Sequence, residues 1–408
     1  MRNATPVLIG ATAAALSATQ SGGGPARQSA AKIEELQAHI MNELLGVSII
    51  ILNYNYGRFL TAAIDSALNQ DHPVCEVIVV DDGSTDDSRT VIAGYGDRIR
   101  SVLGDSNKGQ ITALTNAWPL ASHPILIFLD ADDLLLPHAA ATVARRWTPA
   151  TVKTQSPLVT IDESGRQLGH IAPKFPPNLD TATIRMQLLR SGESILAAAS
   201  GNAYSRALLD RINADGGFEL ENPRTHHMDM ILECNAPFYG EVITVYQPLA
   251  YYRIHGRNLY TASHVDKSHF VMFINAFAIR LNYLTQRCRS LGIPFDPSAA
   301  RNYALWPLEC QLCMHKLTST KDPLGEPLYR TLFRGLRACI DAKLPISRRL
   351  IRAGWFVSVA VSPRVLAKRL IAIRFVITER PSWFEGLLSR IVNVSGGCRS
   401  SLIERVYR

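Results

Sequence analysis

The chain has 408 residues, of which 47% are hydrophobic and 19% are charged, and its net charge is +8. This composition is typical of a globular protein and excludes a chain that is disordered throughout, while the length suits one large domain with an appendage, or two domains. The seven cysteines are scattered and odd in number, which argues against a disulfide framework and favours a reducing, cytoplasmic location.

Positive charge is concentrated near the end of the chain. Residues 265–408 contain 23 Lys or Arg and 9 Asp or Glu. Residues 1–264 contain 20 Lys or Arg and 26 Asp or Glu. Nucleic acid is not an expected partner, because no recognised binding module accompanies this charge. Basic and large apolar residues interleave over 347–377, which fits either a peripheral helix on the inner face of a membrane or the outer helix of a soluble bundle. No uncharged apolar run reaches the length of about twenty residues that a spanning helix needs.

The first 46 residues precede any predicted strand. Residues 1–28 are expected to form a disordered tail, with a signal peptide as the alternative because of the apolar stretch Val7–Leu16. Apolar residues then recur every three or four positions, which predicts an amphipathic helix over 29–46.

From Val47 the pattern alternates between strand and helix. Such alternation predicts a mostly parallel sheet flanked by helices, in a domain over residues 47–263. A hairpin is expected around Glu163–Gly165, and residues 264–408 are expected to form a helical, basic extension. The predicted strands are 47–52, 74–80, 99–103 and 125–129, and the predicted helices are 59–69, 86–95, 110–120 and 137–147.

The loop after the first strand lacks the glycine pattern of dinucleotide and ATP sites. Asn53, Tyr54 and Asn55 can instead stack on a base and hydrogen-bond to a ribose, although an ordinary polar loop is the alternative. Asp81 and Asp82 close the second strand, at the sheet edge where α/β proteins bind ligands. Helix capping explains the acids that follow them, but not this pair, so we expect both to contact a nucleoside.

Three more carboxylates, Asp130, Asp132 and Asp133, follow the fourth strand. They repel one another in a partly dry site unless a cation neutralises them. Mn²⁺ or Mg²⁺ at Asp130 and Asp132, with further ligands from a substrate diphosphate, is the predicted use, and a solvated capping turn is the alternative. The Cys310-x-x-Cys313 pair lacks further metal ligands, so these residues are expected to be buried thiols rather than a zinc or redox site.

In combination, these motifs resemble those of the inverting glycosyltransferases of family 2, which use nucleotide sugars and have the GT-A fold. The resemblance covers Val47 to about Asn258, roughly half of the chain. The matching segments, in order, are Ile51–Asn55, Val79–Asp86, Asn107–Gly109 with Ala113 and Asn116, Leu129–Asp133, Ser200–Ala203, and Tyr252–His255 with Asn258.

The resemblance implies a role for each motif. The loop at Asn53–Asn55 and the pair Asp81-Asp82 would hold the nucleoside, while Asp130 and Asp132 would together meet the ribose and the metal-bound diphosphate. Lys108 opens a helix whose free amides can face negative charge, with a surface turn as the alternative.

The resemblance also implies a catalytic base and a basic motif. Inverting transfer needs a carboxylate that removes the acceptor's proton, and Asp229 matches one member of the family's acidic pair. Glu219, Glu221 and Glu233 are the alternatives, and His226-His227 are expected to be structural. Arg253 and His255 alternate along an extended segment, so both can meet the diphosphate from one face, unless this is an ordinary strand end.

The expected activity is therefore transfer of a hexose from a nucleotide diphosphate sugar, UDP-linked, to a hydroxyl of a glycan or lipid-linked acceptor in cell-surface polysaccharide or glycolipid synthesis. A metal-dependent nucleotidyltransferase and an inactive nucleotide-sugar-binding protein are the alternatives. The first would need a phosphate loop that the chain lacks, and the second is favoured by the missing Glu before Asp229.

Overall fold

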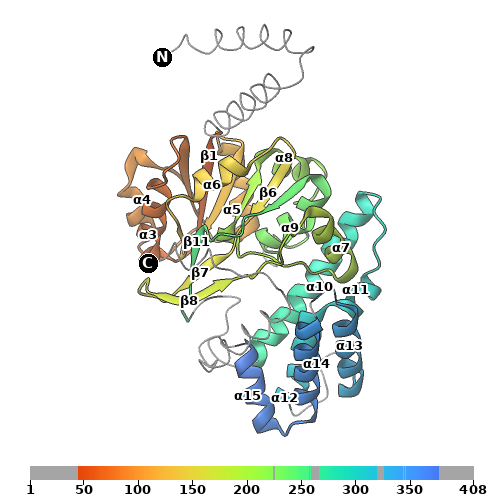
Figure 1. Cartoon of the computed structure of the whole chain (residues 1–408). Helices are drawn as coiled ribbons and strands as arrows, with labels where there is room; N and C mark the ends of the chain where they lie inside the picture. Colours follow the sequence, from red (N-terminus) through yellow and green to blue (C-terminus); the bar gives the residue numbers. More distant parts are fainter. Residues whose placement is uncertain are drawn as a thin grey trace, which may run out of the picture.

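The computed structural model describes residues 45–223, 226–256, 258, 266–318, 326–342, 344 and 346–375. The predicted tail at 1–28 lies outside these residues, as does the predicted helix at 29–46 except for Leu45 and Gly46, which are not helical. An α/β domain is followed by a helical region that lies beyond one end of its sheet (Figure 1).

The α/β domain is built on a seven-stranded sheet in the order β10-β6-β9-β4-β1-β2-β3. β9 is antiparallel to its neighbours β4 and β6, and the other pairs are parallel. The predicted mostly parallel sheet is therefore confirmed. The strands are β1 (Val47–Asn53), β2 (Cys75–Asp81), β3 (Arg100–Leu103), β4 (Ile125–Asp130), β6 (Thr151–Gln155), β9 (Asn202–Ser205) and β10 (Glu241–Thr244).

Helices cover both faces of this sheet, which is why its central strands are apolar on both sides. Successive β1 residues alternate between two cores: Ile49 and Ile51 face one, and Ile50 faces the other. The first core includes residues of α3 (Gly57–Leu68), α4 (Ser88–Ala93) and α6 (Ala139–Arg146). The second includes residues of α5 (Gln110–Ala117), α7 (Thr181–Ser191), α8 (Arg206–Ala214) and α9 (Met228–Tyr239).

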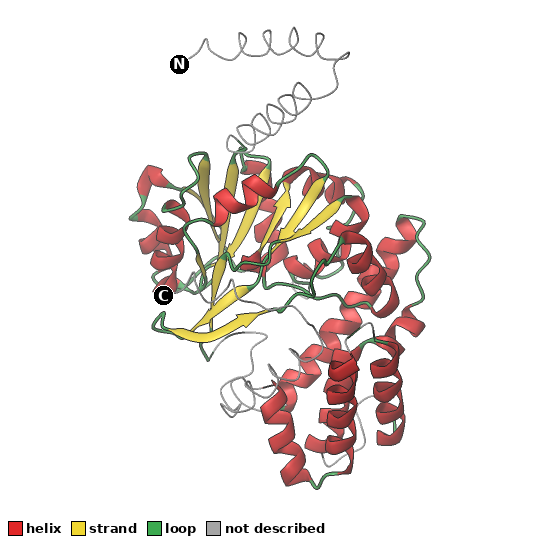
Figure 2. Ribbon diagram, in the orientation of Figure 1, coloured by secondary structure: helices red, strands yellow, loops and turns green. Residues whose placement is uncertain are grey.

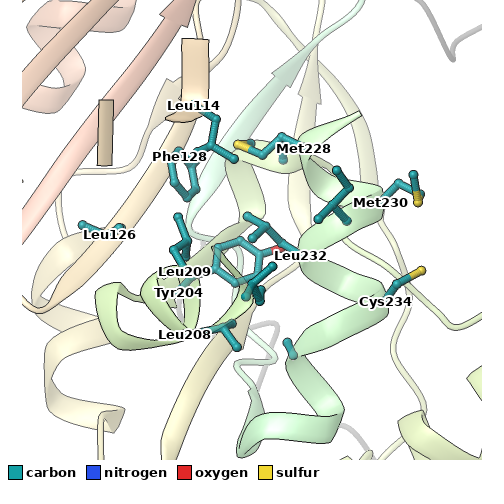
Figure 3. Close-up of a cluster of buried hydrophobic side chains, with 14 of the residues drawn as sticks. Leu114, Leu126, Phe128, Tyr204, Leu208, Leu209, Met228, Met230, Leu232 and Cys234 are labelled. Carbon is teal, nitrogen blue, oxygen red and sulfur yellow. The ribbon is translucent and has the colours of Figure 1, made fainter. Parts of the chain in front are cut away.

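The second core fixes α9 against the sheet. Figure 3 shows Leu114 of α5, Phe128 of β4, Tyr204 of β9 and Met228 of α9 pointing toward one another. All four of these side chains are at most 1% exposed. The start of α9 is thereby held close to the carboxyl end of β4.

A smaller sheet, ordered β5-β11-β7-β8, lies beside the main one (Figure 2). β7 and β8 are antiparallel and form the hairpin predicted around Glu163–Gly165. The four strands are β5 (Leu134–Leu135), β7 (Leu158–Ile161), β8 (Gln167–Ala172) and β11 (Ala250–Arg253).

The C-terminal region is helical, as predicted, and has a core of its own. Leu308 and Leu312 of the central helix α12 pack with Phe356 and Ile371. Cys310 and Cys313 are fully buried free thiols, as expected. Among the described helices, none is long and apolar enough to cross a membrane. The helices are α10 (Lys267–Ser290), α11 (Pro297–Tyr303), α12 (Leu305–Leu317), α13 (Leu328–Asp341), α14 (Ile346–Val361) and α15 (Arg364–Phe375).

Candidate active site

Hydrogen bonds join the loops that follow β1 and β2. The Asn53 amide donates to Asp81 Oδ1 at 2.7 Å and to Ser84 Oγ at 3.1 Å. Asn55 has a positive φ of 59°, and its Oδ1 accepts from the Thr85 backbone N–H at 2.7 Å. Asn53 and Asn55 therefore shape the loop, whereas the Tyr54 side chain between them is 40% exposed. A nucleoside role for these residues remains a prediction.

The two acids at the end of β2 lie in different environments. Asp81 is fully buried, and its carboxylate accepts from Asn53, from the Ser84 backbone N–H at 3.0 Å and from Arg89 Nε at 3.3 Å. Asp82 is half-buried, and its two oxygens accept from the backbone N–H groups of Lys108 at 2.9 Å and Gly109 at 2.7 Å. Asp82 thus holds the turn that precedes α5, and the Lys108 side chain is exposed.

The same helix positions the predicted base. Gln110 Oε1, in the first turn of α5, accepts from the Met228 backbone N–H at 3.1 Å. Met228 begins α9, so Asp229 lies in its first turn, where the helix dipole favours a carboxylate. Asp229 is half-buried and close enough to Asp130 for its charge to help raise the pKa of that group. The structure thus brings Asp229 together with the acids that end β4.

Asp130, Asp132 and Asp133 form one cluster, with a carboxylate oxygen from each within 4.8 Å of the others. Burial, followed by the charges of Asp132 and Asp229, raises the pKa of Asp130 to about 8. Asp133 is buried and accepts from Ser200 Oγ at 2.7 Å and from the Arg253 backbone N–H at 2.9 Å. Asp133 therefore anchors the turn, while the half-buried Asp130 and Asp132 remain accessible.

Arg253 and His255 support this turn from β11 and the segment after it. The Arg253 guanidinium donates to the carbonyl oxygens of Asp132 at 2.8 Å and Glu163 at 3.0 Å, and it lies 4.8 Å from the Phe59 ring centroid. His255 Nε2 lies 2.8 Å from Asp132 Oδ2. Both residues reach the predicted metal ligand, but the Arg253 guanidinium is held by main-chain carbonyls, and contact of either residue with a diphosphate remains a prediction.

The donor set fits a hard divalent cation. Carboxylate oxygens are the ligands that Mg²⁺ and Mn²⁺ prefer, and clustered carboxylates are costly without a counter-charge. Asp130 and Asp132 would hold the ion, with His255 orienting Asp132 from behind. Asp133 is less suited, because its two oxygens already accept hydrogen bonds.

A buried cluster of charged side chains, which the sequence pattern did not predict, joins the α/β domain to the C-terminal region near Asp229. Glu233, one turn along α9, lies 3.8 Å from Lys153 of β6 and 3.4 Å from Arg280 of α10. Burial raises the pKa of Glu233 to about 7, although Lys153 and Arg280 oppose the rise. Burial likewise lowers the pKa of Lys153. The three residues are separated by 80 and 47 positions, so no local spacing could have predicted their contact.

A cavity of about 570 Å³ opens beside Asp229, between the two parts of the chain. Phe273, Phe277 and Trp306 of the C-terminal region form part of its wall. Arg280 and Ser194 also line it, and Arg280 Nη1 and Ser194 Oγ are buried within this wall without a hydrogen-bond partner among the described residues. Aromatic surface beside polar side chains suits a polyhydroxyl ligand.

Comparison with known proteins agrees with this arrangement. The family model described as "Glycosyl transferase family 2" matches residues 48–212. The chain is 32% identical over 257 residues to an uncharacterized glycosyltransferase of Nostoc sp., a match that covers 58% of this chain and 77% of the relative.

A relative with a more specific name matches over a shorter segment. It is the Escherichia coli protein WfgD, named UDP-Glc:alpha-D-GlcNAc-diphosphoundecaprenol beta-1,3-glucosyltransferase, which is 36% identical over 22% of this chain and 35% of its own length. Among solved structures, S. aureus TarS 1–349 in complex with UDP-GlcNAc is 15% identical, with a TM-score of 0.47 over 85% of this chain and 92% of that chain.

Proposed function

The chain belongs to glycosyltransferase family 2 and is a transferase, and from this premise we propose that it transfers a hexose from a UDP-linked sugar, with inversion, to a hydroxyl of a glycan or lipid-linked acceptor. The observation that carries the proposal is the position of Asp229 between two features, the acid cluster at the end of β4 and the aromatic-lined cavity. A base at that boundary can remove a proton from an acceptor hydroxyl while a sugar is held on the other side.

The donor end follows from the loops after β1 and β2. The exposed Tyr54 ring would stack on the base, and Lys108 would face the diphosphate charge beside Asp82. When bound at Asp130 and Asp132, Mn²⁺ or Mg²⁺ would neutralise charge on the leaving nucleoside diphosphate. The Arg253 contacts hold the Asp132 backbone in place, and the His255 ring fixes one oxygen of its carboxylate.

The acceptor end follows from the cavity. Aromatic rings can pack against the apolar face of a sugar, and the polar residues Arg280 and Ser194 belong to the same cavity wall. Three carboxylates, those of Glu193, Asp229 and Glu233, also line the cavity, so an uncharged sugar fits better than a phosphate at this position. The name of the E. coli relative, with its UDP-glucose donor and diphosphoundecaprenol-linked acceptor, supports a lipid carrier further along and a role in cell-surface polysaccharide or glycolipid synthesis.

The competing enzyme class is disfavoured by the loop after β1. A nucleotidyltransferase needs free backbone amides there to hold a triphosphate. In this chain the Asn55 backbone N–H donates to Ser84 Oγ at 2.9 Å and the Gly57 backbone N–H donates to Asp86 Oδ2 at 2.9 Å. Two amides of the loop are thus already engaged.

Donor turnover with matched variants tests the proposal. The purified chain is incubated with Mn²⁺ or Mg²⁺ and a panel of nucleotide sugars and nucleoside triphosphates, and the release of nucleoside diphosphate or pyrophosphate is measured. We expect UDP release from one sugar donor. Asp229→Asn should keep donor binding and lose about 10²- to 10⁴-fold in turnover, because only the proton acceptor is removed.

Two further variants complete the design. Asp132→Asn should lose metal-dependent donor binding, and Asp105→Asn, at an exposed acid, serves as the control. Pyrophosphate release from a triphosphate would indicate the nucleotidyltransferase instead. Donor binding without turnover for every acceptor would indicate an inactive binding protein, the reading that the missing second acid before Asp229 leaves open.

A further inference from the structure

The most exposed apolar side chains of the described residues gather on one part of the C-terminal region. Seven large hydrophobic side chains are 56 to 74% exposed, and all lie between Tyr329 and Val365. Elsewhere in the described ranges, the highest value for such a side chain is 51%, at Tyr246. Exposed apolar side chains that are concentrated in one part of a protein mark an interaction site more often than scattered ones do.

The exposed residues form a stripe on each of two neighbouring helices. On α13, Tyr329, Phe333 and Ile340 recur at the helical spacing. The opposite side of α13 is buried, and Gly335 there lies directly against the Phe356 ring of α14. The α13 stripe therefore faces away from the core of the region.

The second stripe lies on α14 and extends to the start of α15. On α14, Ile346, Leu350, Val357 and Val361 follow the same spacing, while Phe356, Val359 and Ala360 are buried on the other side. Val365 and Leu366 extend the apolar surface to the start of α15. We call these nine exposed residues of α13, α14 and α15 the apolar face.

Positive charge accompanies the apolar face. Residues 328–375 contain eleven Lys or Arg and a single acid, Asp341. Some of this charge is used internally, since Arg352 and Arg374 pair with the buried Glu309. Exposed basic residues remain on both helices that flank α14, among them Arg330, Lys368 and Arg369.

The occupant of this face must supply negative charge and an apolar interior. A second copy would bring the same excess of positive charge against itself, which disfavours self-association. The two end segments of the chain are not suitable occupants either, because neither carries a net negative charge. Residues 1–44 contain three basic and three acidic residues, and residues 376–408 contain five basic and three acidic residues. The surface of an anionic phospholipid bilayer has both properties.

We propose that the apolar face, with the basic residues beside it, docks the protein on the surface of a membrane that contains anionic phospholipid. The helices that carry it lie beyond the end of the sheet near which β7, β8 and β11 lie (Figure 1). The proposal goes beyond the transfer reaction and does not depend on it.

Sedimentation of the full chain with vesicles tests the proposal. We expect it to sediment with vesicles of phosphatidylcholine mixed with phosphatidylglycerol, and to sediment less with phosphatidylcholine alone or at high salt. Phe333→Ser should weaken binding by roughly tenfold, because a large apolar side chain no longer enters the interface. Leu103→Ser, at a comparably exposed apolar residue on β3, should leave binding unchanged.

A charge variant separates the electrostatic contribution. Arg369→Gln should weaken binding about fivefold at low salt, whereas Arg146→Gln, at an exposed arginine of α6, should not change it. Equal sedimentation with neutral and anionic vesicles, or no effect of Phe333→Ser, would overturn the proposal. A different result would also overturn it: the wild-type chain does not sediment with vesicles but forms a dimer in sedimentation velocity, and Phe333→Ser dissociates that dimer.

Discussion

Replacing Glu233 with glutamine should remove a pH-dependent loss of stability. Glu233 is buried where β6, α9 and α10 meet, near Lys153 and Arg280. Burial raises the pKa of its carboxyl from 4.5 to about 7, against the opposing charges of Lys153 and Arg280. The folded protein thus holds the proton more tightly than the unfolded chain does.

The sign and size follow from proton linkage. Because the folded pKa is the higher one, the stability that protonated Glu233 contributes is fully present below about pH 4.5 and is lost as the pH rises through about 7. At 1.4 kcal/mol for each pH unit, the loss is on the order of 3 kcal/mol. Glu233→Gln is neutral at every pH, so it should match the wild type near pH 5 and be more stable near pH 8.

Thermal unfolding followed by circular dichroism across this pH range measures the effect. We expect the unfolding midpoint of Glu233→Gln to exceed that of the wild type by about 5 °C near pH 8 and by little near pH 5. Glu241→Gln, at an exposed glutamate of β10, should follow the wild-type curve. Parallel pH curves for the wild type and Glu233→Gln would refute the reasoning, because they would mean that Glu233 binds protons equally in both states.

Three further predictions concern the metal ligand Asp132, the turn before α5 and the core of the C-terminal region. His255→Ala should raise the Mn²⁺ concentration for half-maximal activity about 10- to 100-fold, because the ring 2.8 Å from Asp132 no longer orients that carboxylate; a metal titration measures this. Asp82→Ala should cost about 1–3 kcal/mol of stability through the two lost backbone hydrogen bonds in the turn before α5, and an unchanged dissociation constant for UDP in calorimetry would contradict its predicted contact with the nucleoside. Phe356→Ala should cost about 3–5 kcal/mol, seen as a lower unfolding midpoint, because a fully buried ring is removed; Leu366→Ala, at an exposed leucine, is the control.

The sheet and the acid-tipped strands could be predicted because their signals are local. Apolar runs that end in Asp81 and Asp130 specify buried parallel strands and the edge at which they end, and β2 and β4 end at these residues in the structure. Cys310 and Cys313 were likewise correctly expected to be buried thiols. In each case, neighbours in sequence determine the environment.

The contacts of the site residues depend on segments that are distant in sequence, so they could not be predicted from local patterns. Alternation predicts that Arg253 and His255 share one face of an extended segment, and both residues contact Asp132. Only the pairing of β11 with β7, however, brings the Arg253 guanidinium onto the Glu163 carbonyl. The contact of Asp82 with the turn before α5 could not be predicted either, because it joins residues 26 positions apart. An acid at a strand end therefore predicts the edge of the sheet correctly, but it does not say whether a ligand or a helix takes up its charge.

The candidate site contains residues from the segment that matches family 2 and residues from the C-terminal region. The match to family 2 ends at residue 212, before Asp229, and the cavity beside Asp229 takes its aromatic wall and Arg280 from α10 and the start of α12. The residues that would hold the donor, from Tyr54 to Asp132, lie within the matched segment. We infer that the choice of acceptor depends on the helices outside it, because Arg280 pairs with Glu233 and lines the cavity together with the aromatic residues of α10 and α12. Arg280→Met should then raise the KM for the acceptor and leave acceptor-independent release of UDP unchanged, whereas equal losses in both would mean that Arg280 supports the fold of the whole site.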